Sequence, residues 1–526
     1  MLLVLVVGLP ILWLTVAALG AGMSGFSSQM LPTAIRETGV LMASVGLATA
    51  LFGMVAAWLV THFEFPLRRL FDWALILPLA VPTYLAAYTY VEFWGFSGPI
   101  QQGVRMINGA TSLREYWFPD IRSHWGASVV MSAVLYPYVY VACRAFFLMQ
   151  STSLDLAART LGASRARTFL TVTLPLSRPA MVVGATLAMM EVVNDLGAVQ
   201  YFGINSLTAI IYATWINRSD FPGAAQLAVT IVLVIGMLIL IEQKARRNRL
   251  FQGQRDSRVP PARERLKGRG AMGAFAFCAA LLTLGFGIPF GQLVYMAFRR
   301  VVPEHVTMAL NALVPTVTVA SIGAIVTVAL GLIAARQQRH GPASRGLIRL
   351  STLGYAIPGT VLALGLLQPL GQFDLAVNRF TMANFDWRPG LIVSGSMLAL
   401  VYVYAIRFLA VSHGTLDAAI RKRGDAMLHA GRVLGAGRWR VLWRIELPTL
   451  SPAIVSAAVL VFVEIIKELP ATLLLRPLGV DTLATLVYQQ ANVALFANAA
   501  LPALLIVLAG LIPVVLATRV GQRSTV

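Results

Sequence analysis

The chain has 526 residues, of which 58% are hydrophobic and 12% are charged. Soluble domains usually have about a quarter of their residues charged, so this composition and a mean hydropathy of +0.74 exclude an ordinary soluble domain. The formal net charge of +20 leaves a membrane location and nucleic-acid binding as two explanations to be separated.

Apolar stretches recur along nearly the whole chain. About 20 apolar residues in a helix cross a hydrocarbon core of roughly 30 Å, and stretches of this kind predict about twelve spans. In chain order we expect them at 2–20, 40–61, 70–93, 126–148, 179–202, 223–242, 271–297, 312–335, 347–370, 389–411, 451–474 and 498–518. The first could instead be a secretory signal, but it has no basic residue before its apolar core and only a poor cleavage site at 17–19. We expect it to be a retained helix.

The basic residues are distributed unevenly over the loops between these spans. With both termini placed in the cytoplasm, 31 of the 42 Lys and Arg residues fall on the cytoplasmic side, 10 fall on the opposite side, and Lys467 lies within a span. This asymmetry is the positive-inside pattern of membrane proteins. It assigns the basicity to topology and to contact with the lipid bilayer, and it argues against nucleic acid as a partner.

The sequence contains few residues that could form a metal site or a disulfide. Cys143 and Cys278 both fall inside predicted spans without a CxxC motif, and none of the six histidines has a second His at i+3 or i+4. We therefore expect neither a disulfide nor a metal site. A P-loop needs Gly-Lys followed by Ser or Thr, and none of the four lysines follows a glycine. The chain itself is expected to bind no cofactor and to carry no catalytic residue.

A basic hydrophilic segment at 246–270 reads as a cytoplasmic linker, and it separates two predicted domains of six spans each, 1–245 and 271–526. Such an arrangement calls for a search for internal repeats. Ala-Ala-Arg-Thr-Leu-Gly-Ala at 157–163, followed by Val-Thr-Leu-Pro, matches Ala-Gly-Arg-Val-Leu-Gly-Ala at 430–436, followed by Ile-Glu-Leu-Pro. The separation along the chain between the two glycines equals that between the two Leu-Pro pairs, and this constant offset indicates a duplication.

The same offset continues into the following span. It relates Glu191 to Glu464, Asn194 to Lys467, Asp195 to Glu468 and Gly197 to Pro470. Looser matches relate Pro82 to Pro358 near the third spans and Arg144 to Arg407 at the ends of the fourth. Six spans in each half place the two copies in the same orientation, which predicts a parallel pseudo-twofold axis along the membrane normal.

The repeated loops at 150–178 and 412–450 have the composition of a docking element on the cytoplasmic face. Residues 157–161 favour helix, Gly162 can adopt the left-handed conformation that ends a helix, and Ser164 can cap a second short helix. The sequence therefore predicts a helix–Gly–helix elbow that Leu-Pro breaks at the bilayer edge. Ordinary basic loops that obey the positive-inside rule are the alternative, which the matched spacing of two copies disfavours.

The residues assigned to docking come from both copies. They are Asp155, Ala157, Ala158, Gly162, Arg165, Arg167, Leu174 and Pro175 in the first loop, and Asp425, His429, Ala430, Gly435, Arg438, Arg440, Leu447 and Pro448 in the second.

With this spacing the chain resembles the inner-membrane permeases of binding-protein-dependent ABC importers. Their signature loop reads Glu-Ala-Ala, three residues, Gly, nine residues, Ile, one residue, Leu-Pro. Both copies fit the spacing, but neither has the glutamate. Leu156 stands in its place in the first copy with Asp155 beside it, and His429 stands there in the second copy with Asp425 one turn earlier.

The resemblance implies an all-α membrane protein whose twelve or so helices form two parallel six-helix permease domains of the type I, MetI-like fold. It implies that each loop forms a coupling helix in a groove of a separate ABC ATPase subunit, present in two copies, which holds ATP and Mg. It further implies a solute-binding protein as partner and a location in the bacterial inner (plasma) membrane. The missing glutamates remove the usual salt bridge to the ATPase.

Two pairs of carboxylates, Glu191 with Asp195 and Glu464 with Glu468, are spaced i,i+4 and are expected on one face of a membrane helix. Charge within a bilayer is costly and usually faces a protein interior or a water-filled path. The pairs could therefore line a transport pathway. They could equally be structural, with Lys467 neutralising one of the carboxylates.

A second resemblance, to the fused permeases of ferric-iron importers, concerns the cargo. It rests on Lys-Glu-Leu-Pro-Ala-Thr-Leu-Leu-Leu-Arg-Pro at 467–477, on Tyr-Pro-Tyr-Val-Tyr at 136–140, and on Val-Gln-Tyr-Phe-Gly at 199–203. Oxygen ligands would suit a hard trivalent cation. Related permeases for thiamine, sulfate or polyamines stay open as alternatives, and so does an ion-coupled secondary transporter of twelve spans.

Overall fold

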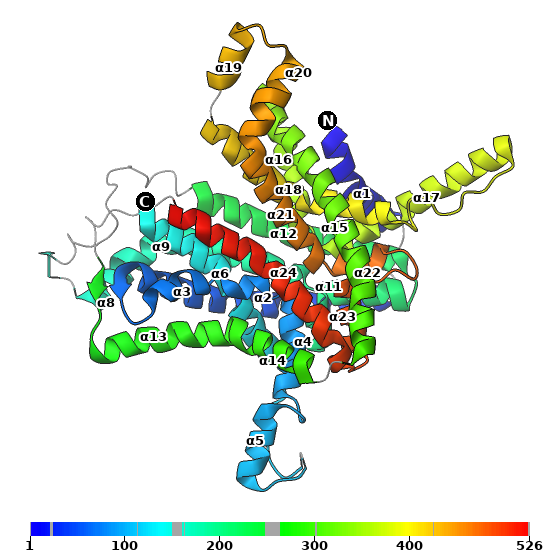
Figure 1. Ribbon diagram of the computed structural model, residues 1–526. Helices are drawn as coiled ribbons and strands as arrows, with labels where there is room; N and C mark the ends of the chain where they lie inside the picture. Colours follow the sequence, from blue (N-terminus) through cyan, green and yellow to red (C-terminus); the bar gives the residue numbers. More distant parts are fainter. Residues whose placement is uncertain are drawn as a thin grey trace. The chain divides into compact units, whose positions relative to one another are not determined.

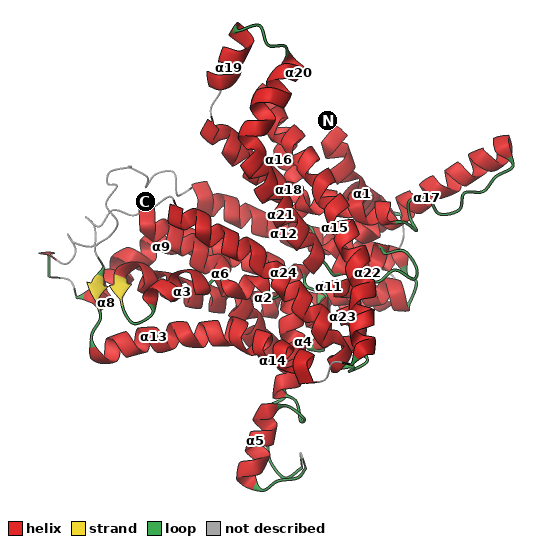
Figure 2. Cartoon of the chain, in the orientation of Figure 1, coloured by secondary structure: helices red, strands yellow, loops and turns green. Residues whose placement is uncertain are grey.

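The computed structural model describes residues 2–20, 25–112, 114–149, 160–162, 164–247, 263–299, 302–423 and 426–523. Almost all of these residues are helical, and the two strands among them, β1 (Phe63–Glu64) and β2 (Glu264–Arg265), pair in parallel over two residues (Figure 2). Ten helices in this part of the chain are long and apolar enough to cross a membrane. The expected all-α membrane fold is confirmed.

The positions of the predicted spans agree with these helices, but several bounds differ. Ten of the predicted spans overlap long helices, whereas the third is a pair of helices, Arg68–Ala80 and Thr83–Asn108, bent by 93°. The expected span 179–202 ends at Asn194, and the expected span 347–370 begins only at Gly359 and runs to Phe385. The first predicted span coincides with α1 (Leu2–Leu19).

The described chain forms two compact units. Unit 1 consists of residues 1–24, 214–229 and 301–516, and unit 2 of residues 25–213, 230–300 and 517–526. Each unit thus takes its first span from the other half of the sequence. In unit 1, α1 packs against α16 (Pro342–Ser351) and α17 (Gly359–Phe385).

Side-chain hydrogen bonds support these unexpected pairings within each unit. In unit 1, the Trp13 indole donates to Gln368 Oε1 at 3.0 Å, and the Tyr402 hydroxyl donates to the Val6 carbonyl at 2.8 Å. In unit 2, the Tyr90 hydroxyl donates to the Leu284 carbonyl at 2.6 Å.

Unit 2 is built around the close pairing of α2 with α6. Its elements in chain order are listed with their bounds: α2 (Gly25–His62), α3 (Arg68–Ala74), η1 (Leu77–Ala80), α4 (Thr83–Trp94), α5 (Pro99–Asn108), α6 (His124–Met149), α8 (Arg165–Thr168), η2 (Phe169–Thr173), α9 (Leu174–Asn194), α10 (Gly197–Tyr201), α11 (Leu207–Tyr212), most of α12 (Phe221–Arg247), α13 (Gly268–Leu282), η4 (Thr283–Gly287) and α14 (Ile288–Arg299). A Cβ at Gly53 would lie 2.7 Å from the Tyr136 carbonyl oxygen, so the two backbones approach as closely as glycine allows.

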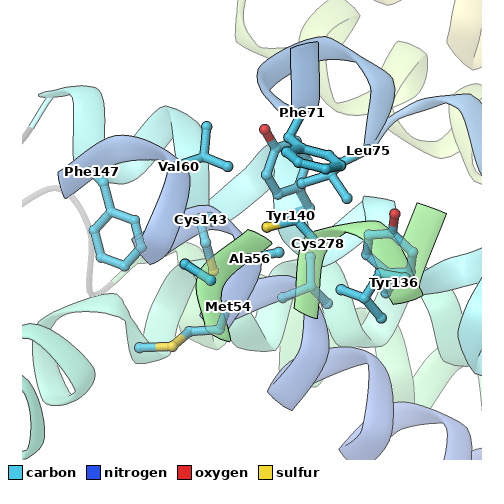
Figure 3. Close-up of a cluster of buried hydrophobic side chains, with 14 of the residues drawn as sticks. Met54, Ala56, Val60, Phe71, Leu75, Tyr136, Tyr140, Cys143, Phe147 and Cys278 are labelled. Carbon is cyan, nitrogen blue, oxygen red and sulfur yellow. The ribbon is translucent and has the colours of Figure 1, made fainter. Parts of the chain in front are cut away.

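The core of unit 2 joins residues of α2, α3, α6 and α13 (Figure 3). Tyr136 and Tyr140 of the Tyr-Pro-Tyr-Val-Tyr stretch are fully buried in it, and the Tyr140 hydroxyl donates to the Asp72 carbonyl. Cys143 and Cys278 both lie in this cluster as buried free thiols. These tyrosines and thiols therefore contribute to packing.

Unit 1 repeats this plan with α15 against α18. Its further elements are α15 (Pro303–Gln337), η5 (Gln338–His340), η6 (Thr352–Ala356), α18 (Met397–Arg423), α19 (Ala426–Val433), α20 (Arg438–Val441), η7 (Leu442–Glu446), α21 (Leu447–Lys467), α22 (Pro470–Leu475), α23 (Leu483–Asn492) and most of α24 (Phe496–Arg523). A Cβ at Gly331 would lie 2.1 Å from Ser412 Oγ. Small residues again set the approach of two membrane helices.

The two copies agree residue by residue over the repeated loop and the span after it. The offset that relates the two glycines of the repeat also maps the bounds of α8, η2 and α9 onto those of α20, η7 and α21, and η2 and η7 are both π-helical. Pro82 and Pro358 cap α4 and α17 with nearly identical backbone angles. The match of Arg144 with Arg407 is wrong. The same offset maps the start of α6 onto the start of α18, so the residue equivalent to Arg144 in the second copy is Asp417.

Candidate functional site

The second repeated loop forms the expected elbow. Helix α19 ends in a Schellman motif, in which the Ala436 amide donates to the Gly431 carbonyl and the Gly435 amide donates to the Arg432 carbonyl, both at 3.0 Å. Gly435 has a φ of 80°, the left-handed conformation that this motif requires. The chain then continues into α20, and Figure 1 shows α19 and α20 as a hairpin beyond the end of α18.

In the first loop, the structure describes residues 160–162 and those from 164 onward. Gly162 has a φ of 85°, and Ser164 caps α8 because its Oγ accepts the Arg167 amide at 3.3 Å. The predicted roles of these two residues in the turn are confirmed. Asp155, Ala157, Ala158 and Asp425 lie outside the described residues, as do the side chains of Arg165 and Arg438.

An exposed leucine marks the tip of each elbow. Leu161 is 88% exposed and Leu434 is 86% exposed, and each directly precedes the left-handed glycine. Arg167 on α8 and Arg440 on α20, a few residues after these leucines, are also exposed. Our reading of the sequence missed these leucines, although Leu-Gly recurs in both copies. Both copies therefore present an exposed leucine at the same position of the repeat.

Leu-Pro does not break the elbow as expected. Leu174 with Pro175, and Leu447 with Pro448, form the first turn of α9 and α21, and the helix continues through them. The π-helical turn that precedes each pair explains this continuity. Proline lacks an amide and crowds the carbonyl four residues earlier, and one wider turn relieves that clash.

The base of the second elbow has an ionic anchor. Glu446, at the end of η7, is 5% exposed, and its carboxylate lies 3.3 Å from Arg336 of α15 and 3.9 Å from Arg423 of α18. It therefore ties the start of α21 to the ends of two other helices. The residue at the corresponding position of the first copy is Thr173, which is 2% exposed. Sequence reasoning did not single out Glu446, which lies just before Leu447.

The candidate pathway residues lie where the fifth span of each half is interrupted. Helices α9 and α21 end at Asn194 and Lys467, and the next residues, Asp195 and Glu468, have extended ψ angles of 120°. The expectation that each carboxylate pair shares one helix face is therefore wrong. The reason is that the second member of each pair lies beyond the helix end.

Asp195 and Glu468 cap the short helices that follow. Asp195 Oδ1 accepts the Ala198 amide at 2.7 Å. Glu468 accepts the amides of Ala471 and Thr472, both at 3.0 Å, and also lies 3.4 Å from Arg407. Both carboxylates are buried, and a charge at a helix N-terminus is favoured by the helix dipole.

The remaining members of the set are less buried. The Lys467 ammonium donates to Glu464 Oε1 at 2.8 Å, so the lysine neutralises this glutamate and not Glu468. Glu191 is half-buried on α9. In the part of the chain that the structure describes, no group of three or more His, Cys, Asp or Glu residues is arranged to hold a metal ion.

Comparison with known proteins finds one family twice in the chain. The model of the family described as "Binding-protein-dependent transport system inner membrane component" matches residues 49–250 and again 327–526. The two matches fall in the two halves that the internal repeat relates, and each contains one elbow.

Individual relatives are similar over different lengths. The Fe(3+)-transport system permease protein FbpB 2 of Haemophilus influenzae is 24% identical over 98% of this chain and 97% of its own length. The molybdenum transport system permease protein ModB of Escherichia coli K12 is 32% identical over 39% of this chain and 88% of its own length. A probable sulfate transport system permease protein cysT of Nephroselmis olivacea is 29% identical over 40% of this chain and 73% of its own length.

Proposed function

Because the chain belongs to the family of binding-protein-dependent transport system inner membrane components, we propose that this ABC importer permease moves ferric iron into the cytoplasm. The family and the membrane helices make the protein a multi-pass permease of the inner membrane and not an enzyme. An ion-coupled secondary transporter loses its support, because the matching family depends on a binding protein.

We choose ferric iron as the cargo because of the length over which each relative aligns with this chain. The relative named for Fe(3+) transport aligns with both halves of this chain, whereas the molybdenum and sulfate permeases align with 39% and 40% of it. The relative named for Fe(3+) transport therefore shares the fused two-domain architecture of this chain. The higher identity of the molybdenum permease makes an oxyanion the second candidate, and thiamine or a polyamine remain further alternatives.

Transport of radiolabelled ferric iron tests the cargo. The permease is reconstituted in proteoliposomes with an ABC ATPase and a solute-binding protein from the same organism, and uptake is measured with excess molybdate, sulfate, thiamine or spermidine as competitor. We expect ATP-dependent uptake of iron that none of these solutes reduces. Uptake of labelled molybdate or sulfate without uptake of iron would contradict the proposal and favour the second candidate.

We infer that the two elbows dock two copies of the ATPase, which holds ATP and Mg. The exposed leucines at Leu161 and Leu434 supply an apolar knob, and nearby arginines such as Arg167 and Arg440 supply positive charge for an acidic rim. Since the family's glutamate is absent from both loops, contact through these knobs is the proposed replacement. Each elbow would engage one ATPase.

Replacing an elbow leucine by aspartate tests the docking. We expect Leu161→Asp and Leu434→Asp each to lower the amount of co-purified ATPase at least about fivefold, because one buried leucine stabilises an interface by about 1.5–3 kcal/mol. Leu478→Asp is the matched control, since Leu478 is fully exposed but lies outside the elbows. ATPase recovery that is equal in all three variants would refute the docking role.

The proposed orientation puts both termini and both elbows in the cytoplasm. The positive-inside distribution of the loops supports it. A cysteine placed at Arg440 tests it with a membrane-impermeant maleimide, because Cys143 and Cys278 are buried and give little background. Labelling of Arg440→Cys from the outside of intact cells would reverse the assignment.

We further propose that Glu191 and the Glu464–Lys467 pair border the transport pathway. Asp195 and Glu468 would instead stabilise the short helices beside it by capping them. Partial burial of the first group and helix capping by the second support this division. Glu191→Gln should raise the KM for uptake with little loss of folded protein. An unchanged KM in Glu191→Gln and in Glu464→Gln with Lys467→Met would remove the first group from the pathway.

A further inference from the structure

The inner side of the second elbow encloses a pocket that docking does not explain. The pocket has a volume of about 780 Å³ and lies in unit 1, between α19 and α20 of the elbow and the ends of α15 and α18. Sites for small molecules typically measure about 300–1,000 Å³. The pocket is therefore large enough for a charged headgroup with part of its backbone.

The polar lining of the pocket is strongly basic. Arg336, Arg339, Arg432 and His429 line it, and Glu446 is the one carboxylate among its described lining residues. Arg423, just behind this lining, also approaches Glu446 at 3.9 Å. Among the described lining residues, arginines therefore outnumber carboxylates three to one.

The lining favours one class of anion. Guanidinium groups donate several hydrogen bonds in a planar fork that matches the oxygens of phosphate, and Arg–phosphate pairs are among the strongest charge-assisted contacts. Arginines reach this pocket from α15 and from α19, so a single tetrahedral anion can be held from two directions. Apolar walls at Ile420 and Val441 adjoin the same space.

The position of the pocket favours one source of that anion. The pocket lies at the ends of two helices that are long and apolar enough to cross a membrane, Pro303–Gln337 and Met397–Arg423. If the elbows are cytoplasmic, as the proposed function has it, these helix ends lie on the side of the cytoplasmic leaflet. Basic pockets between membrane helices on this side bind anionic headgroups.

We propose that this pocket binds the phosphate of an anionic ligand, with a phospholipid of the cytoplasmic leaflet as the favoured source. The bound phosphate would bridge α15 and α19, and it would thereby steady the elbow against the membrane part of unit 1. Only the source of the ligand depends on the proposed function. The lining residue Glu446 is replaced by Thr173 at the equivalent position of the first copy, so the proposal concerns the second elbow alone.

The test uses the full chain purified in a neutral detergent. Native mass spectrometry measures the binding of phosphatidylglycerol, and melting temperature is followed with phosphatidylglycerol or inorganic phosphate. We expect the double variant Arg339→Gln with Arg432→Gln to bind phosphatidylglycerol about tenfold more weakly, and the charge-retaining Arg339→Lys with Arg432→Lys to stay within about threefold. Arg421→Gln is the control, because Arg421 is exposed near the same helix end and lies outside the pocket.

The two arms distinguish the source of the phosphate. Stabilisation by phosphatidylglycerol alone supports a lipid site, and stabilisation by inorganic phosphate as well supports a soluble phosphate ligand. Equal binding by the wild-type chain and the glutamine variant, with neither anion stabilising the wild type, would overturn the proposal. Binding is measured without ATPase, so a failure of ATP-driven uptake would contradict the proposed function while leaving this result intact.

Discussion

The fifth spans of the two halves share their backbone course but differ in the side chains that anchor them. Helices α9 and α21 begin and end at equivalent positions of the repeat, each follows a π-helical turn, and each ends at a buried carboxylate that caps the next helix. In the second half, Glu446 contacts two arginines at one end and Glu468 contacts Arg407 at the other. The corresponding residues of the first half are Thr173 and Asp195.

This difference indicates which features of the repeat are required for its shape. The left-handed glycine, the π-turn before Leu-Pro and the capping carboxylate occur in both copies, so they determine the path of the chain. The ion pairs of the second copy add fixed contacts to that path. We infer that the fifth span of the second half, α21, is held more rigidly than the fifth span of the first half, α9.

Loss of the capping carboxylate should expose the difference most strongly. Glu468→Ala leaves Arg407, whose side chain is 11% exposed, without its partner, and breaking a buried pair costs about 3–5 kcal/mol. Asp195 has no ion-pair partner within the described residues, so Asp195→Ala should cost only the cap, about 1 kcal/mol. Thermal unfolding in detergent measures both. Equal losses would refute the asymmetry, and adding Arg407→Met should partly rescue Glu468→Ala.

The anchor at the base of the elbow should give a smaller effect. Glu446→Ala removes a charged partner from Arg336 and Arg423, and we expect a loss of about 2 kcal/mol together with faster amide exchange in α19 and α20. Thr173→Ala, at the equivalent position, should cost about 1 kcal/mol or less. Hydrogen exchange followed by mass spectrometry compares the two elbows. Exchange in the second elbow that does not change would show that Glu446 is not its anchor.

The left-handed glycines should give equal and modest effects, which tests the shared part of the repeat. A Cβ at Gly162 or Gly435 meets no atom within 4 Å, so the cost of Gly→Val comes from the positive φ alone, about 1–2 kcal/mol. Because the strain lies in the elbow, we expect ATP hydrolysis without matching uptake. Gly291→Val is the control, since Gly291 lies on α14 outside the elbows and also has open space but no positive φ. Normal coupling in both elbow variants would remove the assigned role.

Much of this architecture could be predicted from the sequence. Long apolar stretches and the constant offset of the repeat identified the membrane helices and the duplication, because hydrophobicity and fixed spacing are read directly from residues. The turns at Gly162 and Gly435 followed from the conformational freedom of glycine. The division of the chain at 246–270 into two domains stays a prediction.

Other features depend on contacts that no local pattern encodes. The break after Asn194 was missed because the apolar stretch continues to residue 202 and hides the end of the helix. The anchor formed by Glu446 joins residues that are far apart in the sequence, such as Arg336. Tyr136 and Tyr140 contributed to the resemblance that concerns the cargo, but packing against α2 and α13 places both side chains in the core.

The exchange of first spans has a consequence for biosynthesis. Trp13 of α1 finds its partner Gln368 only 355 residues later, and a ribosome that adds about 5–20 residues per second needs roughly 20–70 s to make that stretch. During this interval α1 is already in the membrane without the helices against which it finally packs. Early insertion therefore relies on lipid or on the insertion machinery to shelter α1, and unit 1 is completed only when nearly the whole chain has been translated.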